Sequence, residues 1–223
     1  MRKILTAIFV AGLVATMAGA GIYAYFSDTE TSSGNTFTAG TLDLKLSSYS
    51  SSGPWTDGVT GTWTLSNMKP GDETPTHAVF FKNFGTIASS TMEISCSYTV
   101  TEESPQTESD TDPHTDEHPN EMAKYMIITT MIYRNDQVNI DCSTGYDSNS
   151  KQTKDDWKIN DANSDGKVSL YELKLDPLIN LPSPDTQPNK ITQLDMRIKF
   201  HEDAGNDFQG DTFNLTMIFT LKQ

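Results

Sequence analysis

A stretch of twelve residues carries oxygen-bearing side chains at a spacing suited to a metal ion. Asp161, Asn163 and Asp165 alternate along the chain. Gly166 permits a sharp turn, and Glu172 closes the stretch. Ca²⁺ takes six to eight oxygen ligands, and an EF-hand loop supplies them from its first, third, fifth, seventh, ninth and twelfth residues. The candidate Ca²⁺ ligands are Asp161, Asn163, Asp165, Lys167 through its backbone carbonyl, Ser169 and Glu172.

The loop could bind Ca²⁺ in more than one structural context. An alternative is a turn rich in Asp and Asn that binds no metal. EF-hand loops usually occur in pairs, and the sequence has no second one, which argues against a cytosolic calcium sensor. We expect the lone loop to order an insertion at residues 155–177 at the calcium levels found outside cells. A short helix, Ser169–Leu175, is predicted to follow the loop and to stop before Pro177.

A second set of side chains gives weaker sequence evidence for a metal site. His114, Glu117 and His118 have the H-x-x-E-H spacing of inverted zinc proteases. Such a site needs both histidines on one face of a rigid helix, together with a third ligand. Here prolines bracket the motif, inside a run at residues 101–121 that is rich in Asp and Glu and has no Lys or Arg. The sequence therefore favours a solvated acidic loop that contains two histidines, and it offers no catalytic residues.

Alternating apolar and polar residues predict the strands that must hold these loops. The alternating runs are residues 42–46, 92–100, 194–200 and 213–221, and denser apolar runs at residues 77–81 and 125–133 suit central strands. No long helical period follows residue 24. The sequence predicts an all-β fold in one domain, residues 25–223. We expect an antiparallel β-sandwich of jelly-roll type, with long polar insertions and a short helix after the calcium loop.

The charge of the chain excludes some classes of partner. The sequence has 16 Lys and Arg against 30 Asp and Glu, for a formal net charge of −14. Nucleic-acid binding requires a basic surface that neutralises phosphates. Docking on an anionic membrane surface has the same requirement. We expect neither partner for the processed chain.

The first residues have the pattern of a secretory signal peptide. A basic start, Met1–Lys3, precedes an uncharged stretch rich in Ala, Gly, Val and Ile. This pattern predicts a signal peptide at residues 1–24, with cleavage between Ala24 and Tyr25. The alternative is a retained membrane anchor, because a bilayer is spanned by about 20 apolar residues. The expected location is secreted, in the extracellular space or at the cell surface.

Export also bears on the two cysteines, Cys96 and Cys142. An even number of cysteines in an exported chain makes a disulfide between them possible, because disulfides persist in oxidising compartments. The alternative is a pair of small buried hydrophobic residues.

Several segments resemble the TasA/camelysin family of exported proteins, which a SipW-type signal peptidase processes. The segments that carry the resemblance are Tyr25–Asp28, Asn35–Leu44, Leu65–Asp72, Gln193–Phe200 and Thr212–Leu221. The middle of the chain, residues 101–188, does not follow the family pattern.

The resemblance implies a jelly-roll subunit that polymerises head to tail into fibres of a biofilm matrix or into pili. In such fibres the freed N-terminal segment of one copy adds as a strand to the next copy. The donor segment here would be residues 25–38, with Tyr25, Phe26 and Phe37 as candidate anchors. The camelysin branch of the family has been classed as metallopeptidases, so a cell-surface metalloprotease is the alternative. A calcium-dependent adhesion module is a third possibility.

Overall fold

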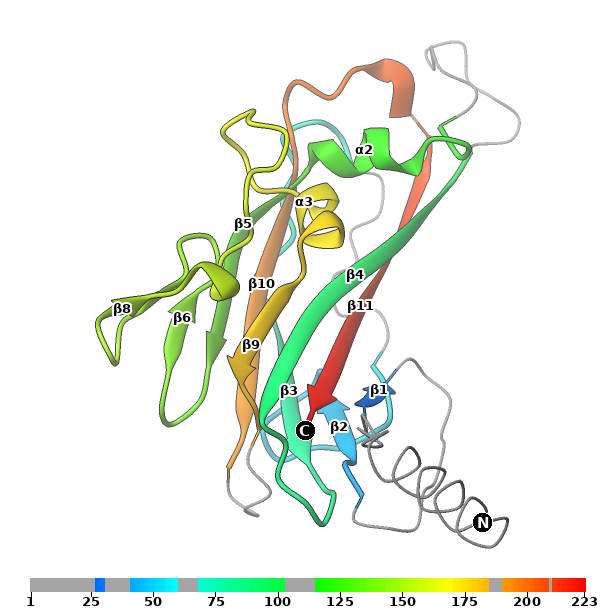
Figure 1. The fold of residues 1–223 in the computed structure, drawn as a ribbon. Coiled ribbons are helices and arrows are strands. Elements are labelled where there is room, and N and C mark those ends of the chain that lie inside the picture. Colours follow the sequence, from blue (N-terminus) through cyan, green and yellow to red (C-terminus); the bar gives the residue numbers. More distant parts are fainter. Residues whose placement is uncertain (1–26, 31–40, 60–67, 103–114, 185–189, 209) are drawn as a thin grey trace, which may run out of the picture.

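Two antiparallel sheets form a β-sandwich, shown in Figure 1. The computed structural model describes residues 27–30, 41–59, 68–102, 115–184, 190–208 and 210–223. The four-stranded sheet has the order β1 (Ser27–Glu30), β11 (Thr212–Lys222), β4 (Thr91–Thr101), β9 (Leu178–Pro182). The seven-stranded sheet has the order β2 (Leu44–Ser47), β3 (His77–Asn83), β10 (Thr192–Phe200), β5 (Met126–Arg134), β6 (Asn139–Asp141), β7 (Tyr146–Asp147), β8 (Gln152–Thr153).

The alternation in the sequence is what allows the two sheets to share one core. Every second residue of β4 from Met92 to Val100 is buried, and β10 shows the same alternation from Thr192 to Phe200. The rings of Phe81 in β3 and Phe219 in β11 meet between the sheets, with centroids 4.6 Å apart. Edge-to-face contact of this kind adds to the stabilisation from apolar burial. The core therefore lies between the layers.

The connections carry the chain repeatedly from one sheet to the other. Successive strands change sheet from β1 to β2, from β3 to β4, from β4 to β5, and at each step from β8 to β11. Two helices, α2 (Pro119–Tyr125) and α3 (Leu170–Leu175), lie close together at one end of the sandwich. The turns η1 (Asp155–Trp157) and η2 (Asn206–Phe208) lie in connections.

The predicted antiparallel β-sandwich is confirmed, and each predicted strand has a counterpart within a few residues. The short helix after the calcium loop is also present, as α3, with Ser169 as its N-cap. Helix α2 was not predicted, and it corrects the assignment of residues 119–121 to the acidic loop. Its first residue is Pro119, a residue favoured at helix starts, and its residues Met122 and Ala123 are buried.

Four short strands, β6 to β9, lie between the strands predicted at residues 125–133 and 194–200. Their lengths of two to five residues are too short to show a period in the sequence. Strands β6, β7 and β8 continue from β5 as successive hairpins, whereas β9 pairs with β4, which is distant in sequence.

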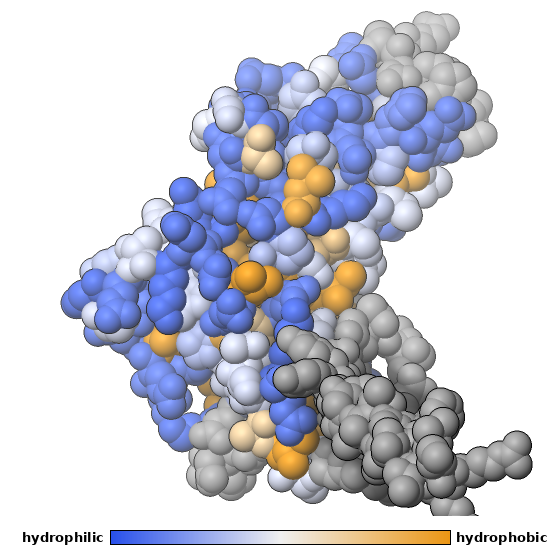
Figure 2. All heavy atoms as spheres, viewed as in Figure 1, coloured by the Kyte–Doolittle hydropathy of each residue, from blue (hydrophilic) through white to orange (hydrophobic). Residues whose placement is uncertain are grey.

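The face of the molecule in Figure 2 is mostly hydrophilic, with small separate hydrophobic patches among the described residues. In the described part of the chain, no helix has the length and apolar character needed to cross a membrane. The predicted signal peptide, the cleavage position between Ala24 and Tyr25, and the anchors Phe26 and Phe37 lie outside the described residues.

Candidate functional site

The first half of the predicted calcium loop is wound around its own side-chain oxygens. Asp161 accepts hydrogen bonds from two backbone amides, those of Asp165 at 3.1 Å and Gly166 at 2.8 Å. Asn163 Oδ1 accepts from the Asp165 amide at 2.9 Å, and Asp165 Oδ1 accepts from the Lys167 amide at 2.9 Å. The φ of Gly166 is +79°, a conformation that glycine adopts at low cost. The side-chain oxygens of the first, third and fifth loop residues thus all accept hydrogen bonds from the backbone amides of residues 165–167.

The second half of the loop ends in a capping box at the start of α3. Ser169 Oγ accepts from the Tyr171 amide at 3.1 Å and also contacts Glu172 Oε2. Glu172 Oε2 in turn accepts from the Ser169 amide at 3.0 Å. Only 1% of Glu172 is exposed, and its second oxygen, Oε1, is buried without a hydrogen-bond partner among the described residues. An ionised oxygen in that position is costly unless a ligand satisfies it.

The loop is fixed to the sandwich by backbone pairing. The Ile128 amide in β5 donates to the Val168 carbonyl at 2.8 Å, and Ile127 forms an isolated antiparallel bridge with Ser169. The eighth and ninth loop residues therefore extend the edge of a core strand. Such pairing holds this half of the loop in register with the sandwich.

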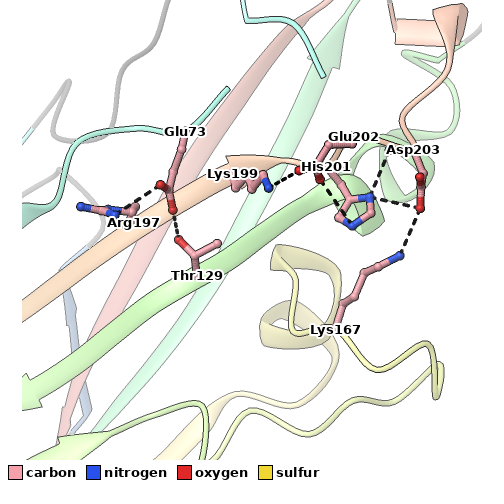
Figure 3. A network of polar contacts seen from close by, with 8 residues as sticks. All are labelled: Glu73, Thr129, Lys167, Arg197, Lys199, His201, Glu202 and Asp203. Carbon is pink, nitrogen blue, oxygen red and sulfur yellow. Dashed lines mark hydrogen bonds and ion pairs between the residues drawn. The ribbon is translucent and has the colours of Figure 1, made fainter. Parts of the chain in front are cut away.

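A polar network ties the loop to the segment that follows β10 (Figure 3). Lys167 Nζ lies 3.8 Å from Asp203 Oδ2. The Asp203 amide donates to His201 Nδ1 at 3.1 Å. Farther along, the Lys199 side chain hydrogen-bonds Glu202 and lowers the pKa of that carboxyl. The carboxylates of Glu202 and Asp203 are exposed, so solvent screens their ion pairs and the network contributes little to the stability of the fold.

The structure does not place the described part of the H-x-x-E-H motif on a helix. Glu117 ends a turn, and His118 precedes α2 with a non-helical φ of −124°. His114 lies outside the described residues. Across the described ranges, no three His, Cys, Asp or Glu side chains are grouped closely enough to hold a metal ion. The described residues of this motif therefore do not fit a zinc protease site, which needs its ligands on a rigid element.

The disulfide considered between Cys96 and Cys142 is not formed, since the structure holds both residues as free, buried thiols. Cys96 lies in β4 and directs its Sγ at the Leu170 carbonyl of α3, 3.4 Å away. Cys142 follows β6 in the other sheet, and its amide donates to the Met131 carbonyl. The two cysteines thus act as small hydrophobic residues of the core.

Among the described residues, β1 covers only part of the edge of the four-stranded sheet. Strand β11 is eleven residues long, and the four described residues of β1 pair with its last four, Phe219–Lys222. The core-facing residues of β11 in this covered part are buried, with Phe219 3% and Leu221 0% exposed. Farther along the same row, Phe213, Leu215 and Met217 are only partly buried. We call residues 212–218, which have no partner on this edge among the described residues, the open edge of β11.

Together, the fold and the loop define an acidic β-sandwich protein with a loop rich in oxygen-bearing side chains and a sheet edge that the described residues cover in part. The family model of camelysin metallo-endopeptidases matches residues 1–223. The chain therefore belongs to the camelysin family, as the resemblance to TasA and camelysin predicted. No curated protein matches the chain.

Two features of these sites were not predicted from the sequence. One is the pairing of the loop with β5, and the other is the unpartnered Glu172 oxygen. The sequence signal for the second was the Ser169-x-x-Glu172 spacing of a capping box, which overlaps the last ligand positions of the loop.

Proposed function

We propose that this protein is an exported structural subunit that polymerises head to tail by strand addition at the open edge of β11. The observation that carries the proposal is the change in burial along β11. The core-facing row is buried where β1 covers the edge and only partly buried beyond it. An added strand would cover Phe213, Leu215 and Met217 and would supply partners for the backbone of the edge.

The proposed occupant is residues 25–38 of a second copy. Residues Ser27–Glu30 of that segment already have strand geometry and pair with β11 of their own chain. Exchange between copies would replace this pairing by the same backbone hydrogen bonds made between two chains, which makes the exchange inexpensive in free energy. At about 3.3 Å per residue, the segment is long enough to follow all of β11. If each copy passes its strand to a different copy from the one whose strand it receives, and the rotation between copies does not close a ring, a filament results.

The direct test is to image the predicted mature chain, residues 25–223, by negative-stain electron microscopy over a range of concentrations. The comparison is a chain that begins at residue 39, with its fold checked by circular dichroism. We expect filaments from the first chain and folded monomers from the second. Monomers of the first chain at every concentration, or filaments of the second, would contradict the proposal.

A metallo-endopeptidase is the second candidate, because the family carries that name. It predicts cleavage of a protein substrate that stops with chelator and with Glu117→Gln. The non-helical backbone at His118 argues against it. The variant Glu121→Gln is the matched control, since it removes a charge from the neighbouring exposed position of α2. Cleavage by both variants at the rate of the unchanged chain would exclude this motif as the source of activity.

A further inference from the structure

We infer that Asp161–Glu172 is a Ca²⁺ site in which strand β5 takes the place of the second loop of an EF-hand pair. The inference does not depend on polymerisation, because every group involved lies in one chain. A lone loop of this kind leaves its eighth and ninth residues without the usual partner loop. Here the Ile128 amide pairs with the Val168 carbonyl, and Ile127 bridges Ser169.

The donor types of the loop suit a hard cation. No three acidic side chains of the described ranges are grouped closely enough to hold an ion as the structure stands, so binding would draw the loop carboxylates together. Only three of the six donors are carboxylates, and the others are an amide, a hydroxyl and a backbone carbonyl, all of them oxygen donors that Ca²⁺ accepts. In the described part of the chain, no Lys, Arg or His forms an ion pair with Asp161, Asp165 or Glu172. The one basic side chain of the loop, Lys167, is directed to Asp203 instead (Figure 3). The carboxylates of the loop thus lack a neutralising partner, which a divalent cation would supply.

The buried carboxylate of Glu172 is an independent indication of a ligand. Its Oε2 turns back from α3 to Ser169, the ninth loop residue, so the carboxylate lies against the loop. Its Oε1 is buried and unpartnered among the described residues. A capping box needs only one oxygen of the glutamate. The second oxygen is therefore available to close the shell of an ion held by the loop.

The attachments of the loop predict that the ion stabilises the whole sandwich. Helix α3 continues from the loop and packs on β4, where Cys96 Sγ contacts the Leu170 carbonyl. Strand β5 is a central strand of the other sheet. A ligand that binds only the folded loop stabilises every element that must fold with it.

The test measures Ca²⁺ binding to residues 25–223 by calorimetry, together with the melting temperature in Ca²⁺ and in chelator. We expect one ion per chain, with a dissociation constant of about 0.1–1 mM, as in extracellular modules. The melting temperature should rise in Ca²⁺ by several degrees. Mg²⁺ should have a much smaller effect, because it demands a smaller octahedral shell.

Two loop variants and one control make the result specific. Glu172→Gln and Asp165→Asn should each weaken binding at least about tenfold and remove the shift in melting temperature. Asp165 is exposed, so its variant tests the site without disturbing the core. Glu121→Gln removes the same charge from an exposed position of α2, outside the loop, and should bind as the unchanged chain does. No binding to the unchanged chain at 10 mM Ca²⁺, or full binding by both loop variants, would overturn the inference.

Discussion

The backbone amide of Ile128, in a central strand, donates a 2.8 Å hydrogen bond to the carbonyl of Val168, in the calcium loop. The bond joins residues that are 40 positions apart and belong to different structural elements. It makes the loop an extension of the seven-stranded sheet. A ligand that orders the loop should therefore slow the exchange of amide protons in β5.

The first prediction concerns hydrogen exchange at this contact. Saturating Ca²⁺ should slow exchange of the Ile128 amide. Its hydrogen bond to Val168 must break before exchange, and with the ion bound that step would also distort the ion's ligands. The measurement is amide exchange by NMR, with and without chelator. The control is the Leu46 amide, which bonds the Thr56 carbonyl at 2.8 Å in another part of the fold. No slowing at Ile128 would contradict the proposed coupling, whereas equal slowing at both amides would show that the ion acts through the stability of the whole sandwich.

The second prediction concerns the cap of α3. Ser169→Ala removes the acceptor for the Tyr171 amide and should lower the free energy of unfolding by about 1 kcal/mol in chelator. The loss should be larger in Ca²⁺, because Ser169 is also a candidate ligand. Urea unfolding measures both values. Ser51→Ala, at an exposed serine, should change stability by less than about 0.5 kcal/mol. An equal loss with and without Ca²⁺ would separate the cap from the ion site.

The sequence predicted the core strands because their residues alternate over long runs. Strands β4 and β11 each continue the pattern for eleven residues. The candidate calcium loop could be proposed from the sequence, since all its candidate ligands are local in sequence, and its metal remains a prediction. The pairing of Val168 with Ile128 was not, because nothing local in either residue specifies the other. The same is true of the open edge of β11, whose length depends on how far β1 reaches.

Helix α2 could not be predicted from the sequence for a different reason. Its seven residues follow an acidic run, and the apolar period that identifies a helix needs a longer window. The proline at its first position was the available signal. Proline is favoured in the first turn of a helix, but it also ends helices and marks turns, so Pro119 alone does not predict a helix here.

The third prediction concerns alkaline pH. Burial raises the pKa of both Cys96 and Cys142 from 9.0 to about 12. Unfolded thiols lose protons above about pH 9, whereas folded ones keep theirs up to about pH 12. The folded state therefore binds more protons in that window, and stability should be full below pH 9 and fall as the pH rises toward 12.

The measurement is the melting temperature of the chain as a function of pH, compared with that of a Cys96→Ala, Cys142→Ala double variant. The variant should be less stable at neutral pH, because alanine leaves part of each site empty, but its decline above pH 9 should be shallower. Part of the decline should remain, because burial also raises the pKa of Tyr98 and Tyr133. Equal declines in the two chains would contradict the assignment to the thiols.

The fourth prediction tests strand exchange, the central claim, most directly. Thr29 in β1 lies opposite Thr220 in β11, so cysteines at these two positions meet the distance requirement of a disulfide. Thr29→Cys and Thr220→Cys are placed on separate chains, which are mixed and oxidised. Ser97→Cys replaces Thr220→Cys in the control, because Ser97 is exposed on β4, on the far side of β11 from β1.

The account predicts a disulfide between residues 29 and 220 of different chains, identified by mass spectrometry, and far less between residues 29 and 97. The native thiols should not interfere, because they are buried. A chain that carries both Thr29→Cys and Thr220→Cys reports pairing within one copy. If that chain closes its own disulfide while the mixed chains form none above the control level, β1 is a strand of its own subunit and the account is contradicted.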